Sequence, residues 1–212
     1  VIAKGTEAGA FDYHCPVMSL SLAFGTVPET VPFSGAYLQV AQEKHALWQE
    51  RLGAKMKPSV GLVWSGSTTH TNDHHRSIPL AAFAELFALP VEFHSLQKEV
   101  REGDAAYLSR LVDHASALHD FTDTAALAQE MDLVISVDTS VAHIVGGLAK
   151  PLWLLLPYVP DYRWMLGRED TPWYPSAVLY RQPAPHDWAE VIARVKEALL
   201  GFLAGCAVNG GA

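Results

Sequence analysis

The sequence predicts an α/β fold, a Rossmann-like doubly wound parallel sheet that follows a short irregular amino-terminal segment. Apolar runs of strand length alternate with amphipathic runs of helix length from residue 59 onward, which is typical of a parallel sheet covered by helices. The run 133–137 is apolar at four of its five positions, as expected for a strand that is buried on both faces. Residues 1–58 instead show glycines, prolines and short apolar bursts.

The first half of the chain is expected to supply the first two strands. Residues 60–64 are a short apolar run, residues 91–96 alternate in polarity, and Pro79 suits the first turn of a helix between them. The elements expected here are, in order, a helix over 42–51, a linker over 55–58, a strand over 60–64, a helix over 80–89, a strand over 91–96 and a helix over 104–114.

The second half is expected to supply the other four strands. Thr122 or Asp123 is expected to cap the helix before strand 133–137. Asp187 and Glu190 resemble a capping box at the start of the last helix. The elements expected here are, in order, a weak strand near 117–118, a helix over 124–131, a strand over 133–137, a helix over 140–148, strands over 152–156 and 177–180, and a helix over 187–204. Right-handed crossovers then favour the strand order 3-2-1-4-5-6.

Composition limits the possible functions. Half of the 212 residues are apolar and the formal net charge is −8, so we expect no binding to nucleic acid or to anionic membranes. No apolar run reaches the ~18 residues of a membrane span. The two cysteines lie near opposite ends, which argues against a disulfide framework and favours a reducing, cytoplasmic compartment.

The expected strand order places a ligand crevice between the first and fourth strands, where the order reverses. Two short hydroxyl-rich loops must line it, 65–69 and 138–140. The second loop also begins a helix, whose first N–H groups have no partner within the helix and attract anions. A diphosphate could bind there, with His143 one turn further along; alternatively, Thr139 and Ser140 merely cap the helix.

Several familiar sites are excluded or disfavoured. The chain has no G-x-G-x-x-G after its first strand, no G-x-x-x-x-G-K-[ST] and no G-x-S-x-G, so we expect neither a dinucleotide dehydrogenase, a P-loop NTPase nor an α/β-hydrolase. His70, His74 and His75 lack the further ligands of a metal site, and we expect no metal. Arg76 could bind a phosphate with its forked guanidinium, or could be a solvated surface residue.

The chain resembles family 9 glycosyltransferases, which include the lipopolysaccharide heptosyltransferases. Residues 134–143 (VISVDTSVAH) and 146–151 (GGLAKP) look like the donor-site signature of that family. The likeness is nearest to bacterial proteins that join such a domain to tetratricopeptide repeats. Other segments that are similar to sequences of that family are 61–66, 76–79, 95–98, 120–123 and 170–175.

The resemblance implies a GT-B fold, in which two Rossmann-like domains face each other and the carboxyl-terminal one binds the nucleotide sugar. It implies that this chain is the carboxyl-terminal, donor-binding domain. It also implies that the substrate is a nucleotide-diphosphate sugar, that no cofactor is needed and that the glycosyl transfer is metal-independent. Arg76 stands where heptosyltransferases use a lysine, and Ser140 stands where they often have glycine. The donor-binding residues that it implies are Ser65, Gly66, Arg76, Gln97, Lys98, Asp138, Thr139, Ser140 and His143.

The resemblance also implies that a part of the enzyme lies elsewhere. The family places its presumed catalytic base in the amino-terminal domain, which residues 1–58 are too short to supply, so no catalytic residue is assigned. We therefore expect the following segments: 1–58 as a remnant of that domain plus a linker, 59–186 as the nucleotide-sugar-binding domain, 187–204 as a packing helix and 205–212 as a tail. The expected partner is an amino-terminal GT-B domain or a set of tetratricopeptide repeats. Two alternatives stay open, a catalytically inactive nucleotide-binding or interaction module and a GT-B sugar-nucleotide epimerase.

Overall fold

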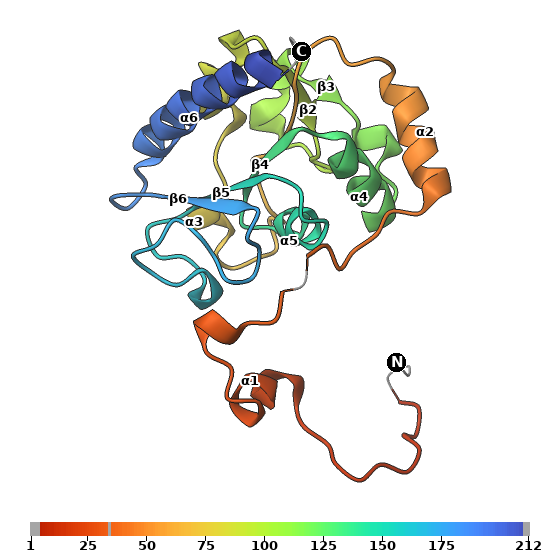
Figure 1. The fold of residues 1–212 in the computed structure, drawn as a ribbon. Helices are drawn as coiled ribbons and strands as arrows, with labels where there is room; N and C mark the ends of the chain where they lie inside the picture. The colour runs from red at the N-terminus through yellow and green to blue at the C-terminus, as the bar shows by residue number, and fades with distance from the viewer. Residues whose placement is uncertain (1–4, 34, 210–212) are drawn as a thin grey trace. The chain divides into compact units, whose positions relative to one another are not determined.

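The computed structural model describes residues 5–33 and 35–209, and it describes side chains up to residue 206. The chain forms two compact units, Val1–Phe33 and Ser34–Ala212. Within its described residues, 5–33, the first contains three short helical turns, η1 (Val17–Ser19), α1 (Leu20–Ala23) and η2 (Pro28–Thr30) (Figure 1).

The second unit begins earlier than the domain boundary that we expected at residue 58. Helix α2 (Gln42–Leu52) packs against α4 (Phe121–Glu130), and it therefore belongs to the same compact unit as the sheet. Trp48 of α2 is 1% exposed, so this contact is part of the protein interior. The interpretation of 1–58 as a remnant of an amino-terminal domain plus a linker stays a prediction.

The second unit contains a six-stranded sheet in the order β3-β2-β1-β4-β5-β6, and every neighbouring pair is parallel. This confirms the predicted fold class and strand order. The strands are β1 (Ser59–Val63), β2 (Glu92–Ser95), β3 (Val112–Asp113), β4 (Leu133–Val137), β5 (Leu152–Leu156) and β6 (Ala177–Arg181).

Helical elements cover both faces of the sheet, and Figure 1 shows α6 on one side and α5 on the other. Alternate residues of β1 and β4, such as Leu62 and Ile135, pack in one cluster with Val191 and Val195 of α6. The remaining helical elements are α3 (Asp73–Arg76), η3 (Leu80–Phe83), η4 (Leu86–Ala88), η5 (Glu102–Arg110), η6 (Ala115–Ala117), α5 (Ser140–Gly147), η7 (Tyr162–Trp164) and α6 (Trp188–Asn209).

Two predicted helices are wrong. The segment 80–89 forms the separate 3₁₀ turns η3 and η4, and Leu89 before Pro90 is extended (φ −76°, ψ 154°), as the residue before a proline prefers to be. The segment 104–114 forms the 3₁₀ helix η5 and then β3, because residues 112 and 113 pair with β2. The weak strand expected at 117–118 is also wrong, since β3 lies earlier and Ala117 ends a 3₁₀ turn.

Of the two predicted amino-terminal helix caps, the one for α4 is wrong and the one for α6 is confirmed. Helix α4 is capped by Asp120, whose side chain accepts from the N–H groups of Thr122 and Asp123, so the predicted caps at those two residues are wrong. Asp187 does cap α6, because its carboxylate accepts from the N–H of Glu190 at 3.2 Å. Helix α6 continues to Asn209, into the expected tail; residues 210–212 lie outside the described part of the chain. In that described part, no helix has the length and apolarity needed to cross a membrane.

Candidate functional site

Two pockets open at the carboxyl ends of the parallel strands. The larger, of about 750 Å³, lies next to the loops that follow β4, β5 and β6 and next to residues 70–76 of the connection after β1. The smaller, of about 490 Å³, lies next to the loops that follow β1 and β2. Thr139 and Ser140 line both, so the pockets adjoin at the start of α5, where the strand order reverses.

The structure brings all nine predicted site residues to these pockets. Arg76, Asp138 and His143 line the larger one, and Thr139 and Ser140 are shared. The smaller pocket is lined by Ser65, Gly66, Gln97 and Lys98 as well. Their role in binding a donor stays a prediction.

The loop after β1 is held by side chains from two other segments. The Gln97 amide donates to the carbonyl of Ser65 at 3.0 Å and accepts from the N–H of Ser65 at 3.3 Å. The Gly66 N–H donates to Ser77 Oγ at 3.0 Å, and Arg101 donates to the Gly66 carbonyl at 3.1 Å. The loop is therefore fixed before any ligand binds, and Gln97 acts on it through the backbone of Ser65.

Arg76 joins the two predicted loops. Its Nη1 donates to the carbonyl of Asp138 at 2.8 Å, and its guanidinium lies so close to Gly66 that a Cβ at that position would overlap it. A side chain at residue 66 would therefore require the guanidinium of Arg76 to move. The side chain is 17% exposed, so Arg76 is not a solvated surface residue.

The start of α5 is not capped by a side chain. Thr139 has an extended backbone (φ −139°, ψ 174°), but its side chain makes no capping hydrogen bond. Its Oγ1 is buried and has no hydrogen-bond partner among the described residues. No side-chain hydrogen bond therefore supports the alternative in which Thr139 merely caps the helix.

His143 lies one turn into α5, and it is held on three sides. Its Nδ1 is 2.9 Å from Tyr174 Oη, its Nε2 is 3.2 Å from Arg163 Nη1, and its ring stacks on Trp164 with centroids 5.4 Å apart. Burial lowers the pKa of His143, which favours the neutral ring.

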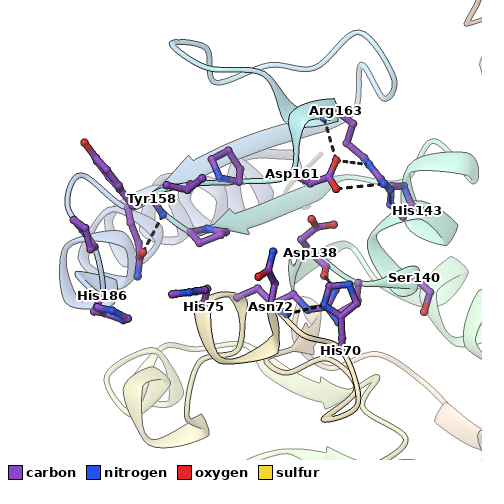
Figure 2. Close-up of a pocket in the computed structure, with 17 residues that line it drawn as sticks. His70, Asn72, His75, Asp138, Ser140, His143, Tyr158, Asp161, Arg163 and His186 are labelled. Carbon is purple, nitrogen blue, oxygen red and sulfur yellow. Dashed lines mark hydrogen bonds and ion pairs between the residues drawn. The ribbon is translucent and has the colours of Figure 1, made fainter.

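The segment after β5 supplies residues that the sequence did not predict. Asp161 and Arg163 form an ion pair with Nε and Oδ1 2.8 Å apart, and both line the larger pocket. Figure 2 shows this pair on one side of Asp138, with Asn72 and His70 on the other. The position of 157–163 directly after a predicted strand could have indicated its place at this edge of the sheet. No sequence pattern identifies which of its side chains enter the pocket.

The described residues contain no group of three or more His, Cys, Asp and Glu side chains that could hold a metal ion. Lys98, the last predicted site residue, donates to the carbonyl of His119 at 2.9 Å.

Comparison with known proteins gives no matching family model. The chain is 26% identical over 205 residues to Protein FlbA of Caulobacter vibrioides, which covers 92% of this chain and 34% of FlbA. The chain thus spans about a third of the length of that relative.

Two solved structures share the fold. The Escherichia coli ADP-heptose lps heptosyltransferase II matches with a TM-score of 0.55 and 14% identity, over 84% of this chain and 56% of that one. A glycosyl transferase family 9 protein from Veillonella parvula matches with a TM-score of 0.55 and 16% identity, over 78% of this chain and 47% of that one. The chain therefore has the Rossmann-like fold that is found in family 9 GT-B glycosyltransferases.

Proposed function

We propose that this chain is the donor-binding part of a glycosyltransferase and that it binds a nucleotide-diphosphate sugar across the two adjoining pockets. The observation that carries the proposal is the start of α5, which has no side-chain cap and lies where the two pockets meet. Its first N–H groups and the helix dipole attract a diphosphate without needing a cluster of basic residues. This suits a chain whose net charge is −8.

The two pockets offer room on either side of a diphosphate bound there. The nucleoside would lie on one side and the sugar on the other, which matches a ligand with the phosphates at its centre. As the bond between sugar and phosphate breaks, negative charge grows on the leaving nucleotide, and the N–H groups of α5 together with Arg76 would stabilise it. We propose that this transfer needs no metal.

The base that activates the acceptor would come from another part of the longer protein. The chain aligns with 56% and 47% of the two similar structures and with 34% of FlbA, so all three contain substantial further chain. An amino-terminal GT-B domain or tetratricopeptide repeats are the partners that we propose. The proposed setting is the cytoplasm.

Ligand-dependent stability tests the binding step. At about 100 times its Kd, a nucleoside diphosphate should raise the free energy of unfolding by about 2.7 kcal/mol. The measurement is thermal unfolding with UDP, ADP and their sugar conjugates at millimolar concentration. Absence of any shift with all of them would reject the donor site. With the full-length protein and a sugar nucleotide that binds, product analysis separates glycosyl transfer from epimerisation and from binding without reaction.

Replacing Thr139 by valine tests the start of α5 directly. Valine keeps the shape of threonine and removes a buried hydroxyl that has no described partner, so the variant should be at least as stable as the wild type. If that hydroxyl donates to a phosphate, the Kd for the nucleoside diphosphate should rise about tenfold. Isothermal titration measures this value.

Two further variants control that experiment. Thr139→Ser keeps the hydroxyl and should retain most of the affinity. Ser176→Ala removes another buried hydroxyl without a described partner, at a residue that lines neither pocket, and it should leave the Kd unchanged. Equal affinities for Thr139→Val and the wild type would contradict the role of this hydroxyl.

A further inference from the structure

The contacts of His143 determine which of its nitrogens carries the proton. A guanidinium has N–H donors and no acceptor, so Arg163 Nη1 must donate to His143 Nε2 across their 3.2 Å contact. In a neutral ring the proton then sits on Nδ1 and is donated to Tyr174 Oη, 2.9 Å away. The side of the ring that meets Arg163 is therefore a hydrogen-bond acceptor.

Tyr174 is held in place on two sides. Its ring lies flat against α5 at Gly146, where a Cβ would overlap the ring, so only glycine allows this approach. Its hydroxyl lies 3.4 Å from the hydroxyl of Tyr37. Because burial raises the pKa of Tyr174, its hydroxyl stays protonated and can donate to Tyr37 while it accepts from His143.

Arg163 is the more accessible cation of the larger pocket. Arg76 and Arg163 are the two Lys or Arg side chains among its lining residues, with side-chain exposures of 17% and 41%. Arg76 donates to the carbonyl of Asp138, whereas Arg163 Nη1 donates to a neutral imidazole. A phosphate oxygen is a much stronger acceptor for a guanidinium than neutral imidazole is.

The position of Arg163 also suits an anion bound at α5. It contacts His143, which is the fourth residue of the helix, and so lies within about one turn of the first N–H groups. Asp161 holds the other side of the guanidinium, with contacts at Nε and at Nη2. The guanidinium can therefore keep this carboxylate while Nη1 turns to a ligand.

We infer that Arg163 is a ligand of the diphosphate and that Tyr174 is a positioning residue that keeps His143 as the acceptor beside it. The inference rests on the proposed function, since it concerns the same site. When Arg163 Nη1 contacts phosphate, His143 Nε2 becomes free to accept a hydroxyl group of the sugar or ribose. The pair thus recognises a ligand in which an anionic oxygen and a hydroxyl group lie close together.

Affinity measurements test Arg163. Arg163→Gln should raise the Kd for ADP or UDP about 10- to 100-fold, the loss expected for a hydrogen bond between charged groups. The fold should be unaffected, because the contact that Arg163 makes with Trp173 Nε1 uses its backbone carbonyl. Arg168→Gln removes the same charge at a residue outside both pockets, where Arg168 pairs with Asp170, and it should change the Kd less than twofold.

The outcomes separate this inference from the proposed function. If the wild type binds ADP or UDP and Arg163→Gln binds equally well, Arg163 is no ligand and the inference is wrong. If the wild type binds neither of these nucleotides nor their sugar conjugates, the proposed function fails, and the role of Arg163 in binding a diphosphate fails with it.

Ring ¹⁵N chemical shifts test Tyr174 without any ligand. In the wild type at pH 8, His143 should show a protonated Nδ1 and an unprotonated Nε2, with its signals assigned by their loss in His143→Gln. Tyr174→Phe removes the acceptor for Nδ1–H and should weaken the preference for this tautomer. Tyr174→Phe combined with Arg163→Gln also removes the guanidinium that donates to Nε2, and it should produce a mixture of both tautomers. A purely structural role for Tyr174 would lower stability and leave the tautomer unchanged, and a wild-type His143 protonated at Nε2 would contradict the inference.

Discussion

Asp104→Ala should lower the free energy of unfolding by about 3 kcal/mol, because it leaves two buried donors without partners. Asp104 is 5% exposed, and its carboxylate accepts from Trp64 Nε1 and from the N–H of Leu80, both at 2.8 Å. Each orphaned donor costs about 1–3 kcal/mol, and removing a buried charge offsets a part of the sum. Urea unfolding followed by circular dichroism measures the difference.

The position of Asp104 explains why the effect should be large. It joins η5 to Trp64, directly after β1, and to Leu80, the first residue of η3. Asp170→Ala is the matched control, since that carboxylate is 74% exposed and pairs with Arg168 at the surface; its loss should cost less than about 1 kcal/mol. A loss below about 1 kcal/mol for Asp104→Ala would show that the two donors find other partners.

The same carboxylate shows where sequence reasoning was insufficient. Residues 104–114 have a helical pattern of apolar side chains, yet the segment forms a 3₁₀ helix and a short strand. The Asp104 carboxylate accepts hydrogen bonds from Trp64 and Leu80, which are 40 and 24 residues away in the sequence. Val112 pairs with β2. Local pattern cannot predict these contacts, which decide the conformation of the segment.

The central strands were predictable for a physical reason. β4 and β5 are buried, β4 is apolar at four of its five positions and β5 at all five, and their bounds match the expected 133–137 and 152–156. Parallel strands with crossovers of one hand then leave little choice of order. The loops at their carboxyl ends follow from that order, which is why the predicted site residues all line the pockets.

The side of the larger pocket that is formed by the segment 157–163 could not be predicted in this way. The connection between β5 and β6 is long, and its one helical element is the three-residue turn η7. Arg163 reaches His143 because that turn lies beside α5, and Tyr174 reaches it because Gly146 leaves space for the ring. These are tertiary contacts between segments that have no shared periodicity.

Between pH 7 and pH 5 the protein should lose about 2 kcal/mol of stability through His114 alone. His94 and His114 are 3% and 6% exposed, and Nδ1 of the first lies 3.1 Å from Nε2 of the second. Burial and the neighbouring His94 lower the pKa of His114 to about 4, against an ordinary value of 6.5. The unfolded chain therefore takes up the proton first, so stability falls as pH falls from 6.5 towards 4.

The charged groups around the pair do not reverse this direction. Glu92 lies 3.2 Å from His94 Nε2, and Asp132 and Asp113 also favour protonation, whereas Arg51 and Lys55 oppose it. Desolvation is the largest influence on both rings and lowers the pKa of each. Trp48 of α2 covers His114 with an edge-on contact, which keeps water from the ring.

Variants at the pair separate its contribution from that of the carboxylates. His114→Gln removes the titrating ring, so the change in unfolding free energy between pH 7 and pH 5 should shrink by about 2 kcal/mol. The window stops at pH 5 because the carboxylates Glu85, Asp120 and Asp123 have lowered pKa values and titrate below it. A His114→Gln variant with the full wild-type pH dependence would mean that protonation of this buried pair does not oppose folding, and the acid sensitivity would then have to arise from groups elsewhere in the chain.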